Sequence, residues 1–274
     1  MEKEAQEAPR MAQLDLAERL YFTMEREGDV VIRTKEAAEQ LGVSLPQASW
    51  VLRRMVAKGY LERVRHGLYA RLPPEVAAAA RKYRADPITL AAGLVSPYFL
   101  SHYTALTLHG AAARVVGTYF VTTPKRPAPF EYRGYRFKFV WASKQRFFGF
   151  ERREYGETEV TVSDRERTLL DVMDRPGYGG GWAEILECLR DYGEVDWERV
   201  LDYLERLGKK VVGRRLGYVM QEVLGVEMPE GVLERLRKRW VDRATLRFGG
   251  GRGGGYVKKW GLVVDEQVFK ESLV

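Results

Sequence analysis

The sequence predicts an α+β protein in which an N-terminal winged helix-turn-helix precedes a larger mixed domain. Residues 34–58 show two helical patterns joined by a turn at Gly42, and a two-stranded hairpin pattern follows over residues 60–72. Short aromatic-rich strand patterns over residues 97–162 indicate an antiparallel sheet, and the helical patterns of residues 181–240 indicate a helical C-terminal part.

These patterns divide the chain into four predicted regions. They are a disordered tail over residues 1–12, the winged helix-turn-helix over residues 13–73, a linker helix over residues 74–86 and the larger domain over residues 87–274. The linker contains the alanine-rich run EVAAAARKYR directly after Pro73-Pro74. A chain of this length is long enough to form two domains.

The composition is typical of a folded protein with a highly charged surface. Hydrophobic residues make up 45% of the chain, which is enough to bury a core and is unlike a disordered chain. The single cysteine, Cys188, cannot form an internal disulfide, and no segment approaches the roughly 18 apolar residues of a membrane span. The start, MEKEAQEAPR, lacks the apolar core of a signal peptide. We therefore expect a cytoplasmic protein with no membrane partner.

The absence of asparagine suggests a thermophilic source. Loss of thermolabile amides together with many charged residues is typical of thermophiles. A GC-rich genome equally explains the low number of isoleucines. A thermal midpoint below about 60 °C, within the ordinary mesophile range, would contradict the thermophile hypothesis.

The net charge of +7 is distributed unevenly along the chain. Residues 81–160 hold 13 basic and 6 acidic side chains, whereas the flanking parts are balanced. Within the N-terminal part, residues 44–71 carry six basic side chains against one acidic side chain, Glu62. Such a patch suits the phosphate backbone of a nucleic acid.

The helix-turn-helix pattern is built from capped, amphipathic segments. A first helix is expected over residues 14–24, and a short strand over residues 30–32. Thr34 is the expected N-cap of the next helix. Ser44 is the expected N-cap of the helix over residues 45–58, and Gln47 completes its capping-box spacing.

The helix over residues 45–58 has one apolar and one polar face. The apolar stripe, which is expected to face the core, consists of Ala48, Val51, Leu52, Met55 and Val56. The opposite face combines an exposed tryptophan with arginines and an amide, and arginine pairs with guanine and glutamine with adenine in the major groove. The hairpin after Gly59 forms the wing, whose tip suits a phosphate or the minor groove. The candidate DNA-binding residues are Ser44, Gln47, Ser49, Trp50, Arg53, Arg54, Lys58, Arg63, Arg65 and His66.

A winged helix used for protein contacts is the alternative interpretation. The basic, amide-bearing outer face favours double-stranded DNA as the partner. No metal or cofactor is expected, because the histidines His66, His102 and His109 have no ligand spacing.

In the central region, strands are expected over the six ranges 97–100, 118–122, 130–132, 135–140, 147–150 and 159–162. Alternation in the fourth places Arg136 and Lys138 on one face, which is either solvated or binds nucleic acid. Ser101 is the expected N-cap of one helix. Ser163 and Glu166 are expected to form the capping box of another.

The C-terminal part adds two kinds of feature. The basic clusters Lys209-Lys210, Arg214-Arg215 and residues 235–239 are interpreted as solvated helix surface. The glycine-rich run Gly249–Gly255 is expected to be a mobile tip between two strands, and it is not a P-loop because no Gly-Lys-Ser/Thr follows.

Three stretches of the chain form a recognisable combination: the helix-turn-helix with its wing, then SHYTALTLHG over residues 101–110, then VTVSDRERTLLDVM over residues 160–173. Together they resemble a known family, the AbiEi-type antitoxins of type IV toxin–antitoxin systems. The positions that match the last two motifs are Ser101, Ala105, Leu106, His109, Gly110, Ser163, Glu166, Leu169, Leu170 and Asp171. The resemblance implies a winged helix-turn-helix joined to an α/β antitoxin-like domain.

The resemblance also implies two activities, repression of the protein's own operon through upstream inverted repeats and opposition to a nucleotidyltransferase toxin. A transcriptional regulator with a sensing or interaction domain and no toxin partner is the alternative. A nuclease that uses Glu166 and Asp171 is disfavoured, because carboxylates five residues apart lie on different faces of a helix. We therefore expect no enzymatic activity.

Overall fold

The structure is a computed structural model, and it describes residues 14–73, 85–112, 114, 117–156, 158–242, 245–248 and 254–265. The predicted tail, the alanine-rich linker helix and most of the glycine-rich run lie outside these residues. Contacts group the chain into unit 1, which is Met1–Ser96 with Glu131–Tyr135 and Tyr155–Thr158, and unit 2, which is the remainder. No helix in the described ranges has both the length and the apolar character needed to cross a membrane.

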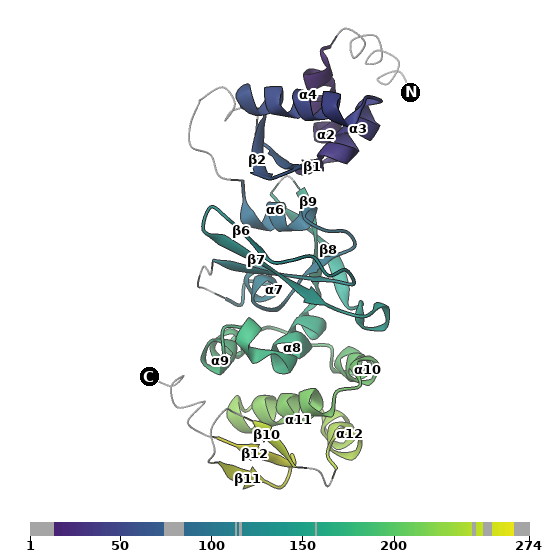
Figure 1. Cartoon of the computed structure of the whole chain (residues 1–274). Helices are drawn as coiled ribbons and strands as arrows, with labels where there is room; N and C mark the ends of the chain where they lie inside the picture. Colours follow the sequence, from purple (N-terminus) through teal and green to yellow (C-terminus); the bar gives the residue numbers. More distant parts are fainter. Residues whose placement is uncertain are drawn as a thin grey trace. The chain divides into compact units, whose positions relative to one another are not determined.

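Unit 1 contains the predicted winged helix-turn-helix (Figure 1). Its helices are α2 (Leu16–Glu27), α3 (Thr34–Leu41), α4 (Leu45–Ala57) and α6 (Pro87–Gly93). Its strands are β1 (Val31–Arg33), β2 (Leu61–Arg65) and β3 (Leu68–Arg71), which form an antiparallel sheet in the order β1-β3-β2. The predicted fold class is confirmed.

The apolar stripe of α4 forms the centre of the core of unit 1. Ala48, Val51, Leu52 and Met55 are at most 1% exposed, and they belong to one hydrophobic cluster with α2. The prediction is confirmed for these four residues, because a period of 3.6 places them on one side of the helix. Val56, the fifth residue of the predicted stripe, is partly buried and packs against the same cluster.

The start of α3 differs from the prediction by one residue. Thr34 is the first helical residue, and Arg33 is the N-cap. The Arg33 backbone N–H donates to Glu36 Oε2 at 2.7 Å. Strand β1 keeps Arg33 extended by pairing it with Leu68, so the helix begins directly after the strand.

Unit 2 contains a six-stranded sheet in the order β6-β7-β5-β4-β9-β8. The strands are β4 (Phe99–Leu100), β5 (Thr118–Thr123), β6 (Phe130–Tyr132), β7 (Tyr135–Trp141), β8 (Phe150–Tyr155) and β9 (Thr158–Ser163), and the tips of the hairpins β6–β7 and β8–β9 group with unit 1. The predicted antiparallel sheet is wrong in part, because β5 pairs with β7 and β4 pairs with β9 in parallel. The reason is that β7 is reached from β5 through β6, and parallel neighbours require such a crossover.

The prediction of a strand over residues 147–150 is also wrong. A short 3₁₀ helix (η1, Lys144–Arg146) and a loop precede β8, which begins only at Phe150. Gly149 has a φ of 71° and lies so close to Arg167 that an added Cβ would be 2.9 Å from the Arg167 Cβ. This left-handed conformation breaks the extended run of aromatic residues.

The two cationic side chains on one face of β7, Arg136 and Lys138, are not equally exposed. Lys138 Nζ lies 4.1 Å from the centroid of the Tyr178 ring, which belongs to the 3₁₀ helix η2 (Pro176–Tyr178). Arg136 is exposed. The face is therefore partly covered within unit 2.

The helices of unit 2 follow the predicted order. They are α7 (His102–Leu108), α8 (Arg165–Asp174), α9 (Trp182–Arg190), α10 (Trp197–Leu207), α11 (Lys210–Tyr218), which continues as a π-helix over Val219–Val223, and α12 (Glu230–Trp240). A second sheet consists of β10 (Leu246–Phe248), β12 (Leu262–Val264) and β11 (Gly255–Val257), in that order. Figure 1 shows α8 and α9 between the large sheet and the layer formed by α11.

The expected capping box at the start of α8 is wrong. Ser163 is the last residue of β9, and Asp164 is the N-cap, whose side chain accepts from the Arg167 backbone N–H at 2.7 Å. Glu166 instead accepts from the backbone N–H of Asp196, the N-cap of α10, at 3.0 Å. Strand pairing extends to Ser163, so the cap moves to the next residue with a suitable oxygen.

Arg214 also departs from the prediction, because it is buried and not on the solvated helix surface. Its Nε donates to the Trp240 carbonyl at 2.8 Å, and its Nη2 contacts Asp242. Lys210 has the expected exposed position and pairs with Asp242 at 2.5 Å.

Candidate nucleic-acid interface

The N-terminus of α4 is fixed by the predicted capping box. Ser44 Oγ accepts from the Gln47 backbone N–H at 3.4 Å, and Gln47 Oε1 accepts from the Ser44 backbone N–H at 3.1 Å and from Ser44 Oγ at 3.0 Å. Both side chains are exposed. Bidentate pairing of Gln47 with adenine needs its amide oxygen, so such recognition would require Gln47 to leave the box.

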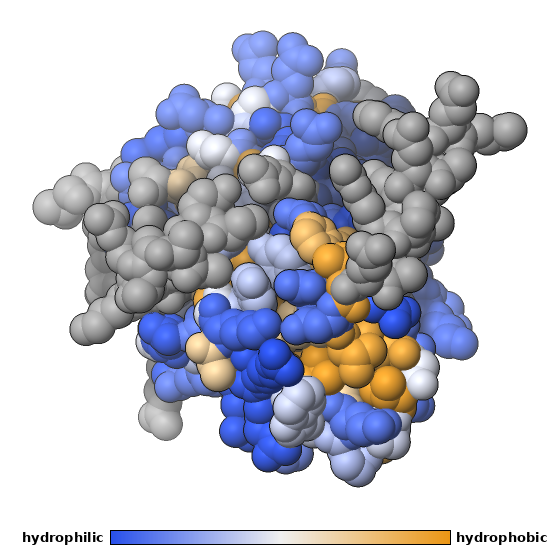
Figure 2. All heavy atoms as spheres, turned by 90° about the horizontal axis from the view of Figure 1, so that it is seen from above, coloured by the Kyte–Doolittle hydropathy of each residue, from blue (hydrophilic) through white to orange (hydrophobic). Residues whose placement is uncertain are grey.

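Large hydrophobic side chains lie exposed on the outer face of α4. Leu45 is 55% exposed and Trp50 is 54% exposed. The guanidinium carbon of Arg54 lies 5.5 Å from the centroid of the Trp50 ring. The face of the molecule seen in Figure 2 is mostly hydrophilic. An exposed tryptophan with an arginine beside it is suited to contact a partner, and it contributes nothing to the core.

Arg53 occupies the middle of the exposed face of α4. Its Nε donates to the Ser49 carbonyl at 3.2 Å, one turn earlier in the helix. This bond uses one of the five N–H donors of the guanidinium group. The others retain the fork geometry that binds a guanine or a phosphate. Ser49 itself is partly buried.

Arg54 and Lys58 share a carboxylate that sequence analysis missed. Asp15 Oδ2 lies 3.7 Å from Arg54 Nη2 and 3.4 Å from Lys58 Nζ. Asp15 is the N-cap of α2, and its bonds with the Glu18 backbone N–H and with Lys58 lower the pKa of its carboxyl group. The spacing of Asp15 and Glu18 is a capping box that the sequence does contain.

The Asp15 pairs are exposed and therefore weak. Exposed ion pairs of this kind contribute about 0–1 kcal/mol. A DNA phosphate can replace Asp15 as the partner of these two cations at small cost.

The wing has the predicted form. Strands β2 and β3 are joined by a turn in which Gly67 has a φ of 71°. The pairing register shifts between Arg63 and Arg65, because one extra residue lies on β2. Arg63, Arg65 and His66 are exposed.

Arg71 does not belong to the cationic surface, although it lies within the predicted basic patch over residues 44–71. Its side chain is 18% exposed, and its Nε donates to the Asp29 carbonyl at 3.2 Å. The exposed cations of the interface are those of α4 and β2.

The carboxylates considered for a nuclease serve separate partners in unit 2. Glu166 contacts Asp196 and Arg199, and Asp171 pairs with Arg167 at 2.8 Å. Over the described ranges, no group of three or more histidine, cysteine, aspartate or glutamate side chains is arranged to hold a metal ion.

The chain is similar to known proteins in its fold and in its N-terminal region. The chain resembles the crystal structure of the RV2827C protein from Mycobacterium tuberculosis with a TM-score of 0.63, 19% identity and coverage of 91% of each chain, a likeness that concerns the fold alone. No curated protein matches the chain. Residues 19–71 match the family model described as transcriptional regulator, AbiEi antitoxin. This match confirms the resemblance for residues 19–71, which contain α3, α4 and the wing.

Proposed function

We propose that this protein is a sequence-specific DNA-binding antitoxin that represses its own operon and counters a nucleotidyltransferase toxin. The observation that carries the DNA-binding part is the outer face of α4, where Trp50, Arg53 and Arg54 are exposed on a helix whose other face is fully packed. In helix-turn-helix proteins the second helix lies in the major groove, where its exposed side chains can reach base edges.

The candidate residues divide by the role that their position gives them. Trp50, Arg53 and Arg54 lie on α4, where they would face base edges in the major groove. Lys58 lies at the end of this helix, and Arg63, Arg65 and His66 lie on the wing, where contacts with phosphates or the minor groove are expected. Base recognition and backbone attraction are therefore separable by mutation.

The DNA-binding proposal is tested by titrating the purified protein against the DNA upstream of its own gene. Scrambled DNA of the same length is the control, at about physiological salt. We expect the upstream DNA to bind at least about a thousandfold more tightly, a typical specificity ratio. Equal, weak binding to both would contradict autorepression and favour the use of the winged helix for protein contacts.

The antitoxin part of the proposal is supported by the family match of residues 19–71. It requires that a nucleotidyltransferase is encoded beside the gene of this protein. It also requires that both proteins occupy the cytoplasm of the same cell. In cells whose growth that nucleotidyltransferase inhibits, co-expression of this protein should restore growth. Failure of a well-expressed, DNA-binding protein to restore growth would contradict the antitoxin role and leave a transcriptional regulator without a toxin partner.

A further inference from the structure

The wing strand β2 carries one acidic side chain, Glu62, among its cations. Glu62 is the only acidic residue of the predicted basic patch over residues 44–71, and it directly precedes Arg63 and lies three residues before Arg65. Three residues of a strand span about 10 Å, which is close to one Debye length at physiological salt. A carboxylate charge left unbalanced at this position would therefore weaken the attraction of the wing for a phosphate backbone.

Glu62 has a cationic partner from a distant part of the chain. Arg133 Nη2 forms an ion pair with Glu62 Oε1, and the Glu62 side chain is only 13% exposed. Glu62 Oε2 is buried and has no hydrogen-bond partner within the described residues. Because water reaches little of this carboxylate, its charge is balanced chiefly by Arg133.

Arg133 lies at the tip of the hairpin β6–β7, and this tip, Glu131–Tyr135, belongs with the wing to unit 1. The φ of Arg133 is 49° and that of Gly134 is 86°. Positive φ at both central residues is the pattern of a type I′ hairpin turn, whose first position favours asparagine, aspartate or glycine. The turn itself therefore gives no reason for an arginine, whereas the ion pair with Glu62 does.

Tyr132 lies beside the ion pair and brings no charge of its own. The Tyr132 side chain is buried, and its ring centroid lies 5.8 Å from the guanidinium carbon of Arg133. Burial and the neighbouring Glu62 carboxylate raise the pKa of the Tyr132 hydroxyl, so this group is neutral at physiological pH. Charges beside a buried ring are screened less than charges in bulk water, which makes the balance between Glu62 and Arg133 effective.

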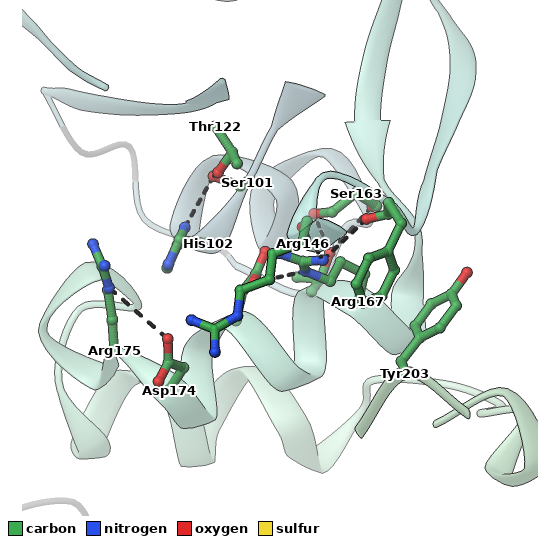
Figure 3. Close-up of polar contacts among 12 residues, drawn as sticks. Ser101, His102, Thr122, Arg146, Ser163, Arg167, Asp174, Arg175 and Tyr203 are labelled. Carbon is green, nitrogen blue, oxygen red and sulfur yellow. Dashed lines mark hydrogen bonds and ion pairs between the residues drawn. The ribbon is translucent and has the colours of Figure 1, made fainter. Parts of the chain in front are cut away.

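Arg133 differs from Arg167, the buried arginine of α8, which Figure 3 shows among other polar side chains of unit 2. The Arg167 side chain is 5% exposed, and it donates to Asp171 and to the carbonyl oxygens of Arg146 and Phe148. The Arg133 side chain is 42% exposed at a hairpin tip. Loss of Arg133 should therefore leave the fold intact, while the charge that it balances remains on β2.

We propose that Arg133 is a positioning residue for DNA binding, which neutralises Glu62 and so preserves the attraction of Arg63 and Arg65 for DNA phosphates. Arg133 acts through Glu62 and does not itself contact DNA. The proposal rests on the proposed DNA-binding function, and it assigns a role in that function to a residue far outside residues 13–73.

The test is a double-mutant cycle of Arg133→Gln and Glu62→Gln, with titration of each full-length variant against the upstream DNA and against scrambled DNA. Glutamine at position 133 can still donate a hydrogen bond to Glu62, so Arg133→Gln removes the balancing charge alone. It should weaken binding to both DNA sequences by a similar factor, about three- to tenfold, because the unbalanced charge repels every phosphate backbone. This loss should shrink as the salt concentration rises.

Rescue by the second substitution distinguishes neutralisation from other roles. The double variant Glu62→Gln/Arg133→Gln has lost both charges and should bind DNA within about twofold of the wild type, as should Arg133→Lys, which retains the positive charge. The control Arg152→Gln removes an exposed arginine that pairs with Glu159 on another hairpin, and it should leave the affinity unchanged.

Three results would overturn the role of Arg133. An equal loss in Arg133→Gln and in the double variant would show that Arg133 contacts DNA directly or that it only shapes the hairpin. Unchanged affinity of Arg133→Gln would show that Glu62 needs no balancing charge. Unfolding of Arg133→Gln, checked by circular dichroism, would assign Arg133 to the fold.

The wild-type titration separates this inference from the proposed function. Specific binding by the wild type without rescue in the double variant would contradict the role of Arg133 and leave DNA binding by α4 and the wing in place. Absence of wild-type binding to either DNA would contradict the DNA-binding function itself, and the role of Arg133 would fail with it.

Discussion

The helices α4 and α8 begin with similar sequence patterns and use their polar residues in opposite ways. In α4 the predicted capping box forms, one face is packed and Trp50, Arg53 and Arg54 are exposed. In α8 every residue from Glu166 to Met173 is buried, and its charged side chains are bound inside unit 2. The polar residues of α4 are therefore available to a partner, whereas those of α8 maintain the fold.

The largest effect should come from breaking the buried ion pair of α8. Arg167→Met should lower the free energy of unfolding by about 3–5 kcal/mol, because it leaves Asp171 as an unpaired buried charge. Denaturant unfolding measures this change. The control Arg152→Met removes an arginine that is 76% exposed and paired with Glu159, and it should change stability by less than about 0.5 kcal/mol. A similar loss in the free energy of unfolding for the two variants would contradict the expected difference between buried and exposed charges.

The second effect concerns base recognition by α4. Arg53→Ala or Arg54→Ala should weaken binding to the specific site by about 1–3 kcal/mol if that arginine contacts a guanine, while the stability of the protein remains nearly unchanged. Titration against specific and scrambled DNA measures the difference. Arg26→Ala, which removes an exposed arginine from the end of α2, is the control. Equal loss on both DNA sequences for both α4 variants would refute base recognition by this helix.

The third effect separates the wing from α4. Arg65→Ala should weaken binding to all DNA sequences alike and reduce the slope of log affinity against log salt by about one, because one phosphate contact is lost. Titrations at several salt concentrations give this slope. A sequence-dependent loss would instead show that the wing recognises bases.

The smallest effect should come from Asp15, the carboxylate beside the α4 cations. Asp15→Asn keeps an oxygen that caps α2, so stability should change little. Release of Arg54 and Lys58 should strengthen DNA binding by less than about 1 kcal/mol, the range of exposed ion pairs. Glu39→Gln, at an exposed carboxylate of α3, is the matched control. Weaker DNA binding by Asp15→Asn would show that Asp15 positions the two cations for DNA.

The sequence by itself determined the elements whose cause is local. The apolar period of α4, its capping box and the wing hairpin depend on neighbours within a few residues, and the structure contains all three. The candidate DNA-binding residues follow from the same periodicity, because burying one face of α4 leaves the other exposed. The DNA that they contact remains a prediction.

Only the tertiary structure decided the features that depend on distant partners. The parallel pairing of β5 with β7 depends on the path of the chain through β6, and the cap of α8 depends on how far β9 is paired. Arg214 is buried because Trp240 and Asp242 approach it from another element. A small cavity in unit 2 is lined by both His102 and Asp171, which are far apart in the chain. Packing of separate elements creates these environments, and no periodicity within one segment records which elements will meet.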